Sequence, residues 1–225
     1  MTLLNSSVKE LVMKDCQLYQ KMIALYVIGG ILGLAIFSMP HSYGFYMGCV
    51  LLMTVMIASG FHMIMLTVIN EKKEQTLPFV MSLPIRPVDY ALAKLMTNLL
   101  IFTVPWAALT LGLAFITLFS PIHDGLLPFL LLISFQLVVN HIVVLSFTVI
   151  TESEGWSIFF MVIVNLFLNP MIMLMAREPV FYEYFDKNEI VWSVEASIIL
   201  SVQIAIILAS LLAAVLRQAR RRTFI

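Results

Sequence analysis

Six long apolar runs divide the sequence, and no Lys, Arg or Asp interrupts any of them. A helix needs about 20 apolar residues to cross the hydrocarbon core of a bilayer. Because lipid offers the backbone no hydrogen bonds, each run is expected to be helical. The sequence therefore predicts an all-α integral membrane protein, a single domain over residues 1–225. Its six transmembrane helices are expected at 22–39, 44–69, 95–119, 126–150, 156–176 and 194–216.

The composition supports this fold class. Hydrophobic residues make up 61% of the 225 residues and charged residues only 12%, whereas a soluble domain has about 25% charged residues. Such a chain cannot cover itself with polar side chains, so the lipid bilayer is its expected solvent.

The distribution of basic residues predicts the orientation. If the N-terminus lies inside, eleven of the 13 Lys and Arg residues fall on the cytoplasmic side, and only Arg177 and Lys187 fall outside. Basic residues are enriched in the cytoplasmic connections of membrane proteins. We therefore expect a multi-pass protein of the plasma (cytoplasmic) membrane with both termini in the cytoplasm.

Residues 3–21 are predicted to form an amphipathic helix on the membrane surface. Apolar residues recur there at spacings of three and four, and polar residues form the opposite stripe. An apolar face beside lysines suits the interface of an anionic leaflet. The alternative is a solvated helix that leads into the first span.

The connection at 70–94 is neither a polar loop nor a span, because its apolar residues are too many for the first and too few for the second. Thr76 can cap a short helix, which Pro84 would end. Pro87 can begin the next helix, with Asp89 in its first turn. A short amphipathic helix of this kind suits docking into a groove on a soluble partner. The alternative is an interfacial loop that packs only on its own chain.

The connection at 177–193 combines aromatic and acidic residues. Aromatic rings with polar neighbours favour the membrane–water interface, so short helices are expected there. An outer gate for a substrate is the other interpretation.

Several polar residues lie inside the predicted spans, where they are energetically costly and tend to face a bundle interior or a cavity. Their other possible role is hydrogen bonding between helices. The adjacent pair at 140–141 is the strongest candidate for a pathway. The candidate pathway-lining residues are His62, Asn98, Gln136, Asn140, His141 and Asn165.

Several sequence signatures of catalysis are absent from the chain. It contains no phosphate-binding loop of the Gly-x-x-x-x-Gly-Lys-Ser/Thr type, no zinc-spaced cysteines and no Gly-x-Ser-x-Gly elbow. We therefore expect no catalytic residues, no metal site and no cofactor in this chain. Its spans also hold almost no ionisable residues, which argues against an ion-coupled carrier.

The segment after the second span resembles the first intracellular loop of ABC-2-type transporter permeases. The resemblance lies in the pattern Glu71-Lys-Lys-Glu74-Gln-Thr76-Leu77, then Ser82-Leu83-Pro84, Asp89-Tyr90 and Ala93-Lys94-Leu95. Gln75 and Ala93 depart from the glycines usual in that family, and both favour a more continuous helix. The six spans, the N-terminal helix and the aromatic outer segment are also similar to the family.

This resemblance implies an exporter-type ABC-2 fold in which the helix at 76–83 is the coupling helix. The partners it implies are ABC ATPase subunits, which would carry ATP and Mg²⁺, and a second copy or a similar permease. No nucleic acid partner is expected. The cargo would be amphipathic or apolar and would be exported or flipped; the alternative is a membrane scaffold or an intramembrane enzyme with no ATPase partner. The residues expected to dock on the ATPase are Glu71, Glu74, Thr76, Leu77, Phe79, Val80, Met81 and Arg86.

Overall fold

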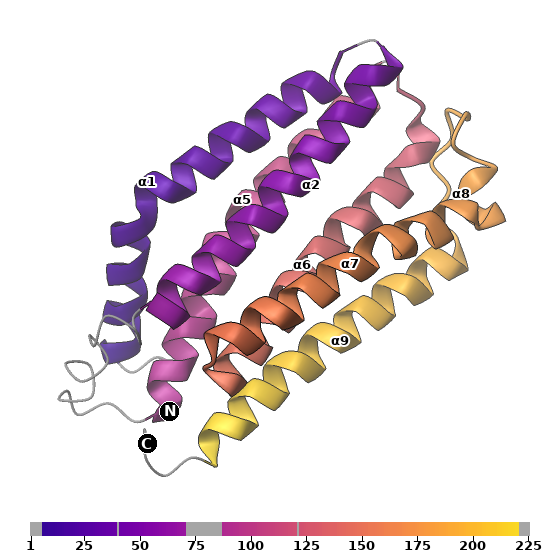
Figure 1. Ribbon diagram of the computed structural model, residues 1–225. Helices are drawn as coiled ribbons and strands as arrows, with labels where there is room; N and C mark the ends of the chain where they lie inside the picture. Colours follow the sequence, from indigo (N-terminus) through magenta and orange to yellow (C-terminus); the bar gives the residue numbers. More distant parts are fainter. Residues whose placement is uncertain (1–5, 40, 71–86, 121, 221–225) are drawn as a thin grey trace.

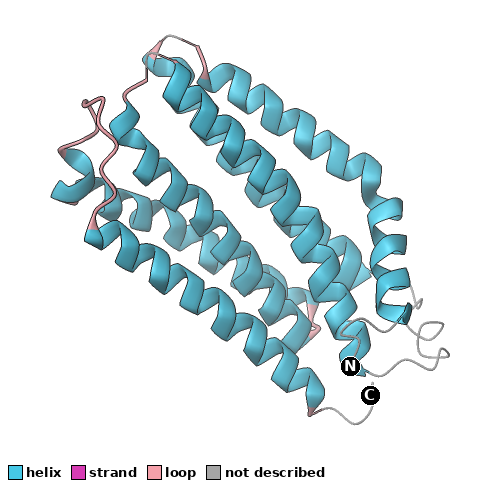
Figure 2. Ribbon diagram, turned by 180° about the vertical axis from the view of Figure 1, so that it is seen from behind, coloured by secondary structure: helices cyan, strands magenta, loops and turns pink. Residues whose placement is uncertain are grey.

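The computed structural model describes residues 6–39, 41–70, 87–120 and 122–220, and every regular element in these ranges is helical (Figures 1 and 2). The first half contains α1 (Ser6–Phe37), α2 (Ser42–Ile64), the π-helical turn η1 (Met65–Asn70) and α5 (Pro87–Phe119). The second half contains the 3₁₀ turn η2 (Asp124–Leu126), α6 (Leu127–Thr151), α7 (Glu154–Arg177), the short α8 (Pro179–Tyr182) and α9 (Val194–Ala219).

Six helices are long and apolar enough to cross a membrane, which makes this a multi-pass membrane protein. They correspond to the six predicted spans, and most of their ends differ from the predicted ones by a few residues. The largest differences follow from helices that extend beyond their apolar cores, since α1 begins at Ser6 and α5 begins at Pro87.

The helices pack as two groups joined through α6. α1 lies along α2 and α5, whereas α6 packs against α9, α7, α5 and α2. Most of α6 is consequently buried, while the apolar faces of α7 and α9 are largely exposed. The polar side chains of this central helix must therefore find partners within the protein.

The close contact between α1 and α2 depends on Gly48. A Cβ atom at this position would lie 2.5 Å from both the Cα and the backbone nitrogen of Phe37. Because Phe37 belongs to the last turn of α1 and is fully buried, a side chain here could fit only if the two backbones moved apart. Glycine therefore sets the distance between these helices.

The N-terminal segment differs from its prediction in one respect. A separate helix at 3–21 was expected before the first span, but residues 6–37 form one continuous helix, which bends where Figure 1 shows α1 changing direction. No Pro or Gly lies between residues 6 and 28 to end the helix. The predicted position of residues 3–21 on the membrane surface stays a prediction.

Two local predictions are confirmed. α5 begins at Pro87 with Asp89 in its first turn, and the aromatic connection contains α8, whose Phe181 is buried against Phe129.

The two ends of the bundle differ in what they carry. α1 begins, α5 begins and α9 ends at one end, whereas α8 and the α1–α2 turn lie at the other (Figure 1). We call the latter the α8 end. An even number of membrane crossings places the start of α1 and the end of α9 at the same end of the bundle, as observed here.

Candidate functional site

Three cavities follow one another from the α8 end into the middle of the bundle. The outermost, which we call the mouth, has a volume of about 690 Å³, the next, the chamber, about 230 Å³, and the innermost, the polar pocket, about 30 Å³. The mouth and the chamber share Phe45, Tyr46, Phe129 and Ile172 in their walls. The cavities are therefore neighbours along the contact of α2 with α6.

The chamber is lined almost wholly by apolar side chains of α2, α5 and α6. Its polar groups satisfy one another. The indole N–H of Trp106 donates to the hydroxyl and the carbonyl oxygen of Ser134, both at 2.9 Å, and the hydroxyls of Thr110 and Ser134 are 2.5 Å apart. An occupant of the chamber would consequently meet an apolar wall.

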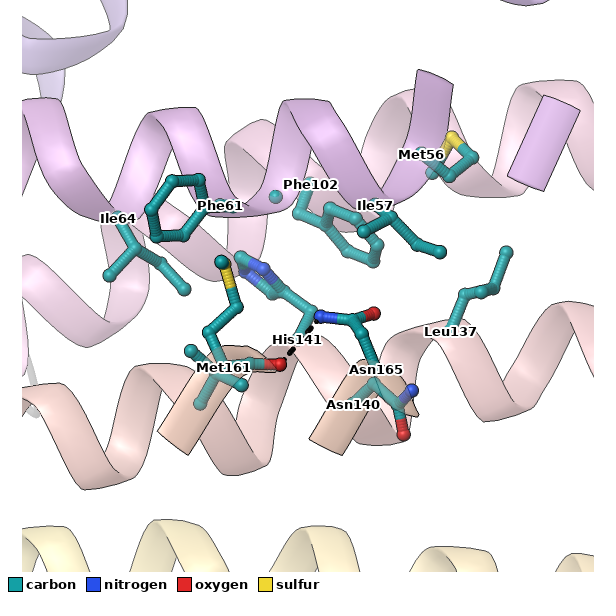
Figure 3. A pocket seen from close by; sticks show the side chains of 12 residues that line it. Met56, Ile57, Phe61, Ile64, Phe102, Leu137, Asn140, His141, Met161 and Asn165 are labelled. Atoms are coloured by element: carbon teal, nitrogen blue, oxygen red, sulfur yellow. Dashed lines mark hydrogen bonds between the residues drawn. The ribbon is translucent and has the colours of Figure 1, made fainter. Parts of the chain in front are cut away.

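Met56 and Leu137 separate the chamber from the polar pocket, because both residues line both cavities. Beyond them lie Asn140, His141 and Asn165 together with apolar side chains of α2 (Figure 3). The pocket's volume suits a water molecule or one small polar group. The structure thus brings three of the six predicted pathway residues to one place.

His141 is the most unusual of these residues. It is buried in α6, with its ring stacked on Phe102 at 4.0 Å between ring centres. A Cβ atom at Gly60 would lie 2.7 Å from its Nδ1, so glycine makes room for the ring. By distance and angle neither ring nitrogen has a hydrogen-bond partner among the described residues, although the backbone of Asn98 interacts with the ring. Buried polar groups are normally satisfied, and His141 shares this exception with Asn140, Ser146 and Thr148 of the same helix.

A chain of side-chain amides leads toward this pocket from α9. Gln203 Nε2 donates to Gln136 Oε1 at 2.9 Å, and Gln136 Nε2 donates to Asn140 Oδ1 at 3.0 Å. Within the described part of the chain the amide nitrogen of Asn140 has no partner. Asn165, on α7, donates to the carbonyl oxygen of Met161 at 2.9 Å. Gln136 therefore orients Asn140, and the pathway role predicted for Gln136 stays a prediction.

The other two predicted pathway residues lie elsewhere. His62 contacts the hydroxyl of Tyr26 on α1 through Nδ1, at 2.8 Å. Asn98 is fully buried and donates to Thr67 Oγ1 at 2.8 Å and to the carbonyl oxygen of Lys94 at 2.9 Å. Neither lines the polar pocket, and both bonds fit the alternative role, the joining of helices.

The eight predicted ATPase-docking residues, at 71–86, lie outside the described residues. Both helical elements that flank this segment, η1 and α5, meet it at the end of the bundle opposite α8 (Figure 1). The docking role stays a prediction.

A buried ion pair between α1 and α5 was not predicted from the sequence. Lys94 Nζ lies 2.7 Å from Asp15 Oδ2, and the two side chains are 2% and 1% exposed. Asp15 follows Leu11 by four residues and Val8 by seven, so it falls on the apolar stripe of α1. This position could have indicated the ion pair from the sequence, because an acid on the buried face of a helix is costly unless it is paired.

Comparisons with family models, curated proteins and solved structures found no match to this chain.

Proposed function

We propose that this chain is the membrane-spanning permease subunit of an ATP-driven transporter of the ABC-2 type. The observation that carries the proposal is the series of three neighbouring cavities, each partly open to the surroundings, along a single six-span chain. A scaffold has no need of an internal route, and the route leads past side chains whose hydrogen-bonding capacity is unused.

The linings of the same cavities support an energy source other than ion coupling. Ion-coupled carriers place ionisable carboxylates near the middle of the membrane. The chamber and the polar pocket have none in their linings. Energy would then come from a soluble ATPase that binds the segment at 71–86, which follows η1 on the cytoplasmic side of the proposed orientation.

In this proposal the α8 end faces outward, in the plasma membrane. Two copies, or this chain and a similar permease, would form the membrane part with two ATPase subunits. The cargo, amphipathic or apolar, would be exported or flipped outward.

The proposal is tested by identifying any P-loop ATPase encoded beside the gene and reconstituting it with the chain in liposomes. Replacing Phe79, Val80 and Met81 together by Asp should abolish cargo-stimulated ATP hydrolysis, because charged side chains cannot enter an apolar docking groove. Replacing the same three residues by Leu is the matched control and should keep most of the activity.

Retention of ATP-driven transport in the triple Asp variant would refute the coupling role. If no adjacent ATPase binds the chain, the proposed transporter has no source of energy, and the transport proposal is contradicted.

A further inference from the structure

We propose that the mouth and the chamber bind one ligand, a single-chain amphiphile with a cationic head group, placing the head in the mouth and the alkyl chain in the chamber. This inference rests on the proposed function, since it names the class of cargo. Binding itself needs no ATPase and can be measured on this chain alone.

The mouth has the aromatic walls that attract organic cations. Phe45, Tyr46, Phe129 and Phe185 all line it. Phe129 and Phe185 lie 5.1 Å apart between ring centres, and Phe45 and Tyr46 lie 5.5 Å apart, edge to face. Aromatic faces bind quaternary ammonium groups through the negative potential of their π-systems. These four rings come from α2, α6 and the connection after α8, so they surround the opening from different sides.

The charge at the mouth has the matching sign. Asp186 lines the mouth and forms no ion pair with any described residue. The nearby cation Lys187 is placed over the ring of Tyr184, 4.5 Å from its centre, and does not line the mouth. The imidazoles of His41 and His123 also line the mouth, and His123 Nδ1 lies 3.0 Å from Asn188 Oδ1. A cationic head would thus meet a carboxylate, whereas an anionic head would be repelled by it.

The chamber is suited to hold the alkyl chain of the ligand. It shares four wall residues with the mouth and is otherwise apolar, so a chain attached to a head in the mouth can extend directly into it. Its volume of about 230 Å³ is below the roughly 300–1,000 Å³ of sites for drug-sized ligands and suits one alkyl chain better than two. Since surrounding lipid is as apolar as the chamber, the head should determine affinity and the chamber should determine which tails fit.

The test uses the full-length chain in nanodiscs and an alkyltrimethylammonium probe with a diazirine at the end of its twelve-carbon chain. Photolysis should attach the probe to chamber residues such as Met53 and Trp106, as identified by mass spectrometry. Unlabelled dodecyltrimethylammonium should compete, whereas dodecyl sulfate of equal chain length should not. Empty nanodiscs give the background partitioning into lipid.

Two variants separate the head site from the tail site. Asp186→Asn should weaken competition by dodecyltrimethylammonium about three- to fivefold, the size expected for an exposed charge pair. Glu189→Gln removes a charge from the same connection outside the mouth and should leave competition unchanged. Ile133→Trp, which fills the chamber, should prevent labelling of Met53.

Labelling confined to lipid-facing residues, equal competition by dodecyl sulfate, or equal effects of Asp186→Asn and Glu189→Gln would each overturn the inference. Asp186 is exposed, so its variant tests the head site even if Ile133→Trp does not fold. Positive binding with a chain that binds no ATPase would refute the proposed function and leave the binding site intact.

Discussion

At the scale of single residues, the bundle contains two kinds of buried polar group. Lys94 and Asp15 neutralise each other at 2.7 Å, and Asn98 extends the polar contact to Thr67. In His141, in contrast, both ring nitrogens lack hydrogen-bond partners among the described residues, whereas Asp15 and Asn98 each lack one only at Oδ1. The first kind holds helices together, whereas the second costs stability and is expected to be retained for function.

The ion pair leads to a prediction about stability. Asp15→Asn should destabilise the protein by about 3–5 kcal/mol, because it removes the carboxylate that lies 2.7 Å from the buried ammonium of Lys94. The double variant Asp15→Leu with Lys94→Met should recover most of this loss, since two apolar side chains replace two charges. Thermal unfolding in detergent measures both.

Glu10→Gln, which changes an exposed acid of the same helix, is the control and should unfold at the wild-type temperature. A double variant as unstable as the single one would show that the pair does not act as a unit.

His141 leads to the opposite expectation. His141→Leu should raise stability by about 1–3 kcal/mol, because a buried polar group without a partner is removed. The same variant should lose most of its ATP-driven transport if the imidazole serves the cargo. Unfolding temperature and transport rate, measured on one preparation, distinguish this from a structural role, in which both would fall or neither would change.

At the scale of helices, boundaries could be predicted better than contacts. Pro87 predicted the start of α5 because proline fits the first turn of a helix. The continuity of α1 was missed because an amphipathic stripe followed by an apolar run indicated two separate environments, although nothing in the sequence interrupts the helix.

The contacts of the candidate site could be predicted only in part. The polar character of Asn140, His141 and Asn165 marked them as candidates. Their convergence in one pocket, and the placement of His62 on α1 instead, depend on which helices are neighbours. The spans are similar in length and hydropathy, so no local sequence pattern indicates which helices pack against each other. For the same reason the chamber was not predicted, because its residues are ordinary apolar side chains.

The helix contact at Gly48 gives a third prediction. Gly48→Ala should destabilise the protein by about 1–3 kcal/mol, the cost of forcing packed groups apart, because the new methyl would overlap the backbone of Phe37. Gly155→Ala is the matched control, since a Cβ there meets nothing within 4 Å. Melting temperatures of the two variants should therefore differ clearly, and equal values would contradict the role given to Gly48.

At the scale of the whole molecule, the orientation can be tested directly. Cys16 and Cys49 are both free thiols and can be replaced by Ser to give a background without cysteine. Lys187→Cys should then react with an impermeant maleimide in intact cells, whereas Arg220→Cys should react only after permeabilisation. These two positions lie at opposite ends of the bundle, and the reverse pattern would invert the proposed topology.

The ion pair between α1 and α5 has a consequence for synthesis. Asp15 and Lys94 are separated by 79 residues, so the ribosome exposes the acid, together with its exposed neighbour Lys14, well before Lys94 exists. A carboxylate whose only early partner is an exposed lysine is unfavourable in hydrocarbon, which should keep the start of α1 near the water boundary while the nascent chain grows. Only when α5 enters the membrane can the first helix settle into its final depth. The protein would then complete the insertion of its first segment after its third.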